Sequence, residues 1–147
     1  MPINTWRSLR RCISIAALVI LVPAAAADDL ADLQGHWDVI DAYTEGKRYS
    51  ELIGGQMQID GDRLVLKNAQ REERAILSLD ESTLPKRLDV RNPDKPDEWA
   101  PGIYQLTGDD LQWVWDPTGS KAIRPSEFQS RAGSEEFWLI LRRKPRE

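Results

Sequence analysis

The segment 102–116 constrains the fold more than any other part of this chain. Two arms of alternating apolar and polar residues flank the turn-forming tetrad Thr-Gly-Asp-Asp at 107–110. This pattern is typical of a β-hairpin, in which successive side chains point to opposite faces of the strand. One face of the hairpin carries five large apolar side chains, those of Tyr104, Leu106, Leu111, Trp113 and Trp115. Because so much apolar surface has to be buried, we expect the rest of the chain to supply further strands around it.

Residues 1–27 have the pattern of a secretory signal peptide. Three arginines precede the apolar run 13–22, and the alanines at 24–27 offer a small-residue cleavage site before Asp28. The run is well short of the roughly 20 apolar residues that a membrane-spanning helix needs. We therefore expect cleavage near Ala27, a secreted or periplasmic product, and one mature domain, residues 28–147, with no membrane span. An uncleaved amphipathic anchor is the alternative.

Cysteine usage and charge exclude several classes of function. The only cysteine, Cys12, lies in the predicted signal peptide, so the mature chain has no disulfide, no thiolate chemistry and no cysteine-ligated metal. Residues 28–147 carry 17 basic and 24 acidic side chains, a net charge of −7. Nucleic acids and anionic membranes favour basic surfaces, so we expect neither as a partner.

Alternation between turn-forming segments predicts seven or eight strands in the mature chain. The segment 73–79 alternates less regularly, so a helix is an alternative there. The segment 137–141 is apolar on both faces, which predicts a central or closing strand. The other expected strands are 35–42, 56–59, 63–66, 86–91 and the two hairpin arms, with a short extended piece at 127–129.

Strands joined by short links form an antiparallel sheet whose two open edges must be protected. Closure removes both edges, and eight strands enclose an interior that side chains fill or that holds one small ligand. We therefore predict an all-β antiparallel barrel of seven to eight strands, with a two-sheet β-sandwich as the alternative. We expect Trp37 and Trp138 in its core, and we expect 92–101, which contains three prolines, to be a long exposed connection.

Gly35-x-Trp37 opens the first expected strand, and Arg142 and Arg143 end the last one. These two ends of the predicted strand order resemble the lipocalin-type arrangement. The resemblance implies that the tryptophan closes one end of the barrel and that an arginine lies across its ring. A guanidinium over an indole gains about 0.5–2 kcal/mol from the cation–π interaction, which favours this arrangement.

A longer set of motifs runs through the predicted mature chain. The motifs are Leu33-Gln34-Gly35-His36-Trp37, Gly46-Lys47, Leu79-Asp80, Pro85-Lys86, Leu88-Asp89, Gly102-Ile103-Tyr104-Gln105-Leu106, Gly108-Asp109, Leu111, Arg124-Pro125-Ser126-Glu127-Phe128 and Leu141-Arg142-Arg143. Together they resemble a family of small secreted lipocalin-like domains, known mainly from planctomycete bacteria and without an established activity. The resemblance extends from about residue 30 to residue 144 and implies the barrel fold alone. At Val114-Trp115 the chain departs from the family, where a smaller residue or a cysteine is common; an inward Trp115 would fill volume that a ligand could use.

Residues suited to catalysis are few. His36, the only histidine, lies on the strand face opposite Trp37, so we expect it in solvent and away from any nucleophile. The aspartates of 60–62 and 109–110 fit hairpin turns better than a calcium site, which needs six to eight oxygen ligands. Adjacent carboxylates are typical of a solvated acidic surface. We therefore expect no catalytic residue, no metal and no cofactor; an enzyme with two converging carboxylates is the weakest alternative.

Aromatic residues supply the candidate binding groups. We predict a small, partly apolar ligand inside the barrel, bound by Tyr104, Trp113, Trp115 and Arg124. Packing in a filled core is the alternative role for the aromatic residues, and an ion pair with Asp89 or Asp116 is the alternative for Arg124. Trp99, in the proline-rich connection, is a candidate contact for a protein partner. The second hypothesis is accordingly a non-enzymatic, inhibitor-like protein-interaction module with a filled barrel.

Overall fold

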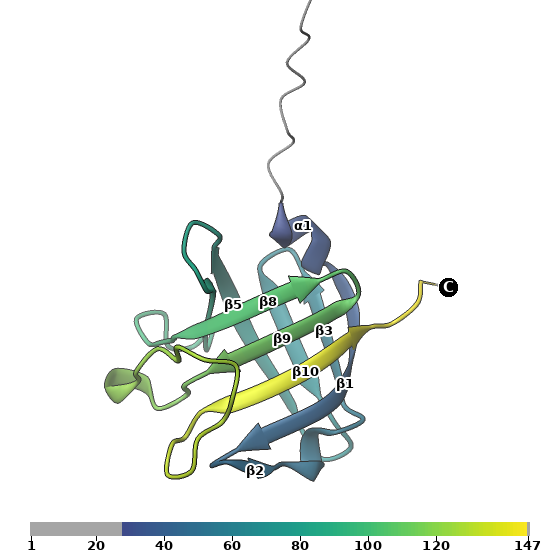
Figure 1. The fold of residues 1–147 in the computed structure, drawn as a ribbon. Coiled ribbons are helices and arrows are strands. Elements are labelled where there is room, and N and C mark those ends of the chain that lie inside the picture. Colours follow the sequence, from purple (N-terminus) through teal and green to yellow (C-terminus); the bar gives the residue numbers. More distant parts are fainter. Residues whose placement is uncertain (1–27, 147) are drawn as a thin grey trace, which may run out of the picture.

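The computed structural model describes residues 28–146, which form a closed antiparallel β-barrel (Figure 1). The wall follows the order β1-β3-β4-β5-β6-β8-β9-β10, and β10 pairs back with β1. This closure confirms the predicted all-β barrel and excludes the sandwich. The predicted signal peptide, residues 1–27, lies outside the described residues. The wall strands are β1 (Gly35–Thr44), β3 (Gln56–Asp60), β4 (Arg63–Lys67), β5 (Glu72–Asp80), β6 (Lys86–Arg91), β8 (Gly102–Thr107), β9 (Asp110–Trp115) and β10 (Phe137–Arg143).

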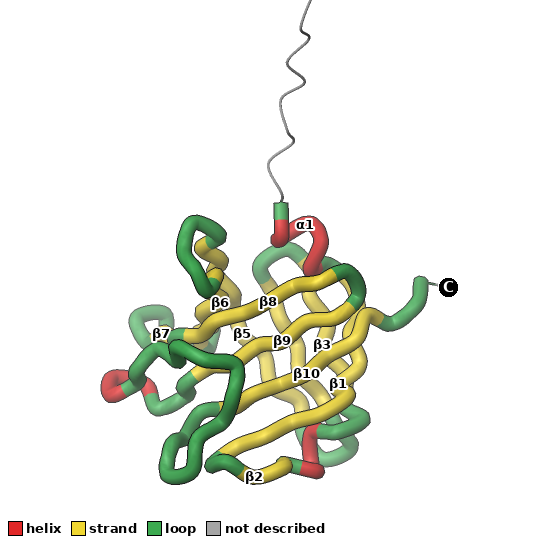
Figure 2. The backbone as a smooth tube through the Cα atoms, in the orientation of Figure 1, coloured by secondary structure: helices red, strands yellow, loops and turns green. Residues whose placement is uncertain are grey.

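Short elements complete the chain and lie mostly at the two ends of the barrel (Figure 2). The helix α1 (Asp29–Leu33) precedes β1. Two-residue strands, β2 (Lys47–Arg48) and β7 (Trp99–Ala100), pair with β1 and β6. Single 3-10 turns are η1 (Ser50–Leu52) and η2 (Gly119–Lys121). The segment 127–129, predicted as an extended piece, is loop.

The predicted hairpin is present as β8 and β9. Gly108 makes its turn with a φ of +60°, a conformation that glycine adopts without the steric cost of a Cβ. The inward side chains of β9 are Leu111, Trp113 and Trp115, and all three are buried. The hairpin therefore supplies the largest part of the aromatic core, as its alternation predicts.

The weakly alternating segment 73–79 is also a strand, so the helical alternative is wrong. It forms most of β5, which pairs with β4 and β6 along its length. Leu77 is buried, and Ala75 and Leu79 pack against the same core. Burial of this face against the barrel interior decides the conformation where the local pattern is ambiguous.

The segment 137–141 is confirmed as a closing strand, but the prediction for Trp138 is wrong. Leu139 and Leu141 on β10 point inward and are fully buried. Because side chains alternate along a strand, Trp138 points outward, where its ring stacks on Tyr43 at 4.9 Å and its Nε1 donates to Gln112. A strand that is apolar on both faces thus covers the core with one face and carries a half-buried outer aromatic pair on the other.

One end of the barrel is closed by α1 and Trp37. The Trp37 indole is fully buried, and its Nε1 donates to the carbonyl of Leu33 in α1 at 2.9 Å. The Arg143 guanidinium lies over the ring at 4.3 Å, which is the contact predicted from the ends of the sequence. α1 covers this end in Figure 1.

Candidate functional site

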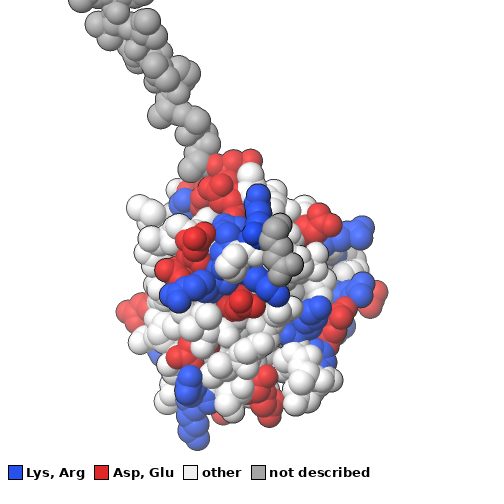
Figure 3. Space-filling view, turned by 90° about the vertical axis from the view of Figure 1, so that its right-hand side faces the viewer, with Lys and Arg blue, Asp and Glu red and all other residues white. Residues whose placement is uncertain are grey.

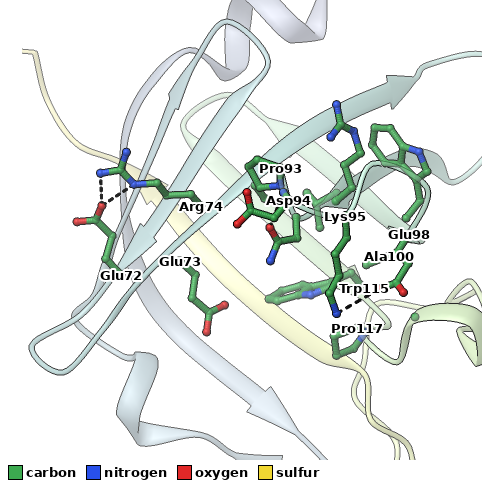
Figure 4. A pocket seen from close by; sticks show the side chains of 16 residues that line it. Glu72, Glu73, Arg74, Pro93, Asp94, Lys95, Glu98, Ala100, Trp115 and Pro117 are labelled. Carbon is green, nitrogen blue, oxygen red and sulfur yellow. Dashed lines mark hydrogen bonds and ion pairs between the residues drawn. The ribbon is translucent and has the colours of Figure 1, made fainter.

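Two neighbouring cavities lie at the open end of the barrel. The larger has a volume of about 810 Å³ and the smaller about 250 Å³. Glu73, Trp115 and Pro117 line both, so the two cavities belong to one region, which we call the mouth (Figure 4). The larger cavity is within the range of about 300–1,000 Å³ typical of ligand sites.

A stack of aromatic rings forms the floor of the mouth. The Trp115 ring lies 3.9 Å from Trp113 and 5.2 Å from Phe137, nearly parallel to both. Trp113 Nε1 donates to the Leu88 carbonyl at 3.3 Å, which fixes the lower ring. Trp115 is 9% exposed and Trp113 is 2% exposed, so of these two stacked rings it is Trp115 that presents indole surface to the cavity.

The floor results from the alternation of side chains along β9, which runs from one end of the barrel toward the other. Leu111, Trp113 and Trp115 follow one another on its inward face, and Trp115 is the last residue of the strand. Phe137, the first residue of β10, is directly opposite Trp115 in the ladder. The two strand ends therefore place two aromatic rings at the same level of the barrel.

Charged side chains of both signs surround the mouth. Glu72 pairs with Arg74 at 2.8 Å, Glu98 with Lys95 at 3.7 Å, and Glu73 lies 3.5 Å from Arg71. These side chains are exposed by 45% or more, and pairs of this kind contribute little to stability. They remain free to exchange partners with a bound molecule.

The mouth opens because β6 separates from β5. The last pair of their ladder joins Ile76 with Arg91, and continuing the register by two residues would place Pro93 opposite Arg74. Proline has no N–H and cannot donate in a ladder. The chain instead turns through 92–98 and returns as β7, which pairs with the other side of β6. The wall beside residues 72–75 is left without its next strand, and the larger cavity lies there.

The closed end contains a buried polar cluster around Asp29. Tyr104 Oη donates to Asp29 Oδ2 at 2.8 Å, and Lys86 Nζ donates to the same oxygen at 2.7 Å. Burial, together with the bond to Asp29, raises the pKa of Tyr104 well above its usual value. Burial alone would raise the pKa of Asp29, but the bonds from Lys86 and Tyr104 outweigh it and lower that pKa. The cluster ties α1 to β6 and β8.

The structure brings two of the four predicted ligand-binding residues to the mouth. Trp115 lines it and Trp113 supports Trp115 from below. Tyr104 belongs to the polar cluster at the opposite end. Arg124 donates to both carboxylate oxygens of Asp89, at 2.5 and 2.9 Å, and to the Gly102 carbonyl, so it joins the loop 117–136 to β6 and β8. These contacts match the alternative role predicted for Arg124, an ion pair with Asp89.

Trp99, the predicted partner contact, lies on the rim of the mouth. It is 38% exposed, and the Arg91 guanidinium lies 5.3 Å from its ring. Trp99 lines the larger cavity together with Arg91. The residue is therefore near the candidate ligand site rather than on a separate surface.

Sequence reasoning did not identify Glu73, Pro93 and Pro117 as residues of the site. Glu73 looked like one of several solvated carboxylates, and both prolines looked like ordinary loop residues. Pro93 follows β6 by two residues, and this proximity was the available signal that the strand must leave the wall there. The position of Arg74 opposite it depends on the register between strands, which the sequence pattern does not contain.

A separate cavity of about 410 Å³ lies beside the end of β10, where His36, Arg143 and Lys144 contribute to its lining. Basic and acidic side chains are intermixed on the face from which the C-terminal end leaves (Figure 3). Two ion pairs, Arg142–Asp110 and Arg143–Asp109, join β10 to the start of β9 and to the turn before it. Among residues 28–146, no helix is long and apolar enough to cross a membrane. Within the same range, no group of three or more His, Cys, Asp or Glu side chains could hold a metal ion.

Comparison of the chain with protein-family models, curated proteins and solved structures gave no match. The functional conclusion therefore depends on the geometry of the mouth and on the chemistry of its residues.

Proposed function

We propose that this protein is a binding protein that holds a small, partly apolar molecule at the mouth of the barrel. The main support is the cavity of about 810 Å³, whose floor is the Trp115 ring. This ring is held in place by Trp113 and Phe137. A fixed indole gives an apolar ligand face a large contact area at little entropic cost. The charged rim would orient the polar part of the same ligand.

The interior below Trp115 supports binding at the mouth rather than deep inside the barrel. Trp37, Met57, Tyr104 and Trp113 are each at most 2% exposed and fill the closed half. The groups that a ligand could reach are thus those above Trp113. The proposal keeps the predicted class of ligand and moves its site to the open end.

Binding without catalysis fits the buried carboxylates of the described residues. Asp29 accepts from Lys86 and Tyr104, Asp116 accepts from Thr118 and Ile123, and Glu136 accepts from Arg131. Each carboxylate has its own set of protein donors, an arrangement that serves structure rather than acid–base chemistry. The predicted signal peptide and the resemblance to secreted lipocalin-like domains support a secreted or periplasmic place of action as part of the proposal.

A protein-interaction module is the second candidate function, and Trp99 favours it. An indole that is 38% exposed beside a cavity is a suitable anchor for a partner. Because Trp99 and Trp115 line the same cavity, the two candidate functions use one region of the surface.

The test is a titration with two defined probes, lauric acid and 8-anilinonaphthalene-1-sulfonate, followed by tryptophan and probe fluorescence. We expect saturable binding that Ala75→Phe weakens about tenfold or more, because Ala75 lines the cavity and a larger ring would occupy it. Trp138→Phe is the matched control, since it alters an aromatic residue outside the barrel and should leave affinity unchanged. Absence of saturation with both probes, together with a bare polypeptide mass by native mass spectrometry of protein from a secreting host, would contradict the proposal.

A further inference from the structure

Residues 72–75 of β5 form a free strand edge inside the mouth. They pair with β4, while the ladder with β6 begins only at Ile76. Leu77 N donates to the Asp62 carbonyl and Asn68 N donates to the Arg71 carbonyl, so the odd-numbered residues of this stretch direct their backbone groups toward β4. Backbone groups alternate in direction along an antiparallel strand. The N–H and C=O groups of Glu72 and Arg74 therefore point to the opposite side.

These four backbone groups face the larger cavity. In the described part of the chain, neither Glu72 nor Arg74 has a backbone partner on that side. The loop across the gap begins with Pro93, which cannot supply the missing donor. Figure 4 shows Arg74 and Glu73 on one side of the cavity, Pro93 and Lys95 on the other, and Trp115 between them. An unpaired edge next to a cavity is a template for an added strand.

The side chains around the gap define what an added strand would carry. A residue paired with Ala75 would point inward, because Ala75 does, and would reach the Trp115 floor. A residue paired with Glu73 would point the same way, next to a carboxylate whose present contact with Arg71 is 3.5 Å long and exposed. Cross-strand neighbours of opposite charge stabilise a sheet. The favoured pattern is an apolar residue opposite Ala75 and a basic residue opposite Glu73, with one outward residue between them.

We propose that the occupant of the mouth is an extended peptide segment that pairs with Glu72 and Arg74 as an additional strand and places an apolar side chain on Trp115. This inference depends on the proposed function, ligand binding at the mouth, and names the class of ligand. It unites the two candidate functions, because the bound segment belongs to a polypeptide partner and Trp99 lies on the same rim.

The first experiment selects ligands and then tests their backbone. Random seven-residue peptides displayed on phage are selected on the purified protein, and enriched sequences are synthesised with an N-methyl group at each peptide bond in turn. We expect enrichment of the apolar-x-basic pattern. Methylation should lower affinity about tenfold or more at the residue that donates to Arg74 and by less than about twofold at its neighbours, whose N–H groups point away.

The second experiment tests the strand edge on the protein side. Arg74→Pro removes the N–H that faces the cavity and leaves the ladder with β4 intact, since that ladder uses the neighbouring residues. Arg74→Ala is the matched control, because it removes the side chain and keeps the N–H. We expect a loss of peptide affinity of about tenfold or more for the proline variant and of less than about twofold for the alanine variant. If Arg74→Pro does not fold, the methylation series on the unaltered protein decides the question.

Failure to enrich any peptide, or peptide binding that is insensitive to backbone methylation, would overturn the inference. The fluorescence titration separates this outcome from failure of the proposed function. Saturable binding of lauric acid or 8-anilinonaphthalene-1-sulfonate without peptide binding would leave the mouth as a small-molecule site and reject the strand. Absence of both would reject the inference and the proposed function together.

Discussion

Gly102 has no room for a side chain. A Cβ at this position would lie 2.5 Å from the Leu88 carbonyl oxygen and 2.8 Å from Trp113 Nε1, groups that hydrogen-bond each other below the mouth. Gly102→Ala should therefore lower the free energy of unfolding by about 1–3 kcal/mol, measured by urea denaturation. Gly108→Asn is the control: it has open space and a φ of +60° that asparagine tolerates, so its effect should be below about 1 kcal/mol. Equal unfolding midpoints for the two variants would contradict the crowding argument.

Tyr104 should make the free energy of unfolding fall at alkaline pH. Its pKa is raised in the folded state, so its contribution is fully present below about pH 10, where an unfolded tyrosine ionises, and is lost as pH rises further. Tyr104→Phe keeps the ring and removes the hydroxyl that donates to Asp29. We expect a loss of about 0.5–2 kcal/mol at pH 7 and a shallower decline of stability above pH 10 than in the unaltered protein. If the unfolding free energies of the two proteins, measured with urea, fall equally steeply above pH 10, Tyr104 does not produce this dependence.

At the scale of elements, Arg143 connects β10 with α1. Its guanidinium covers the Trp37 ring and donates to the carbonyls of Asp32 and Gln34. Arg143→Met should therefore cost about 2–3 kcal/mol, from the cation–π contact and the lost hydrogen bonds. Its neighbour Arg142 is 64% exposed and pairs only with Asp110, so Arg142→Met should cost less than about 1 kcal/mol. Thermal unfolding of the two variants checks the difference, and equal losses would contradict the assigned role.

Elements with regular alternation and clear turns could be predicted from sequence. The β8–β9 hairpin, with glycine at its turn, contains both signals within 15 residues, and its inward face follows from the spacing of the aromatic residues. Trp138 could not be placed, because both faces of β10 are apolar and only its neighbours decide which face is inside. Ile40 is a similar case: a bulge between Val39 and Asp41 reverses the alternation of β1, and nothing in the local pattern marks it.

The candidate site was only partly predictable for a related reason. Trp113 and Trp115 belong to one strand, so their proximity is a local property of the sequence. The position of Pro93 across from Arg74, where the ladder has already ended, follows only from the register between β5 and β6. Tyr104 is the cross-strand partner of Trp113 on the inward face of the hairpin, but its hydroxyl bonds to Asp29 of α1, a contact between distant parts of the chain that the hairpin pattern does not contain.

At the scale of the molecule, the two ends of the barrel differ in construction. The closed end has a buried indole under a guanidinium and a helix tied to the wall by Asp29. The mouth has a missing length of wall, exposed ion pairs and a proline-bearing loop. Local opening requires little energy where few apolar contacts and few backbone bonds hold the chain. The mouth should accordingly be the part of the barrel that responds to a ligand.

Amide hydrogen exchange with and without saturating lauric acid tests this division. We expect ligand to slow exchange at least about tenfold at the amides of residues 72–75, 92, 94, 95, 98 and 99, which line the larger cavity. Amides paired between β1 and β3 around Trp37 should keep their rates, because the aromatic stack and the filled closed half separate them from the site. Slowing that is uniform over the whole barrel would indicate global stabilisation instead. Slowing that is centred on Trp37 would place the ligand at the closed end and contradict the mouth as the binding site.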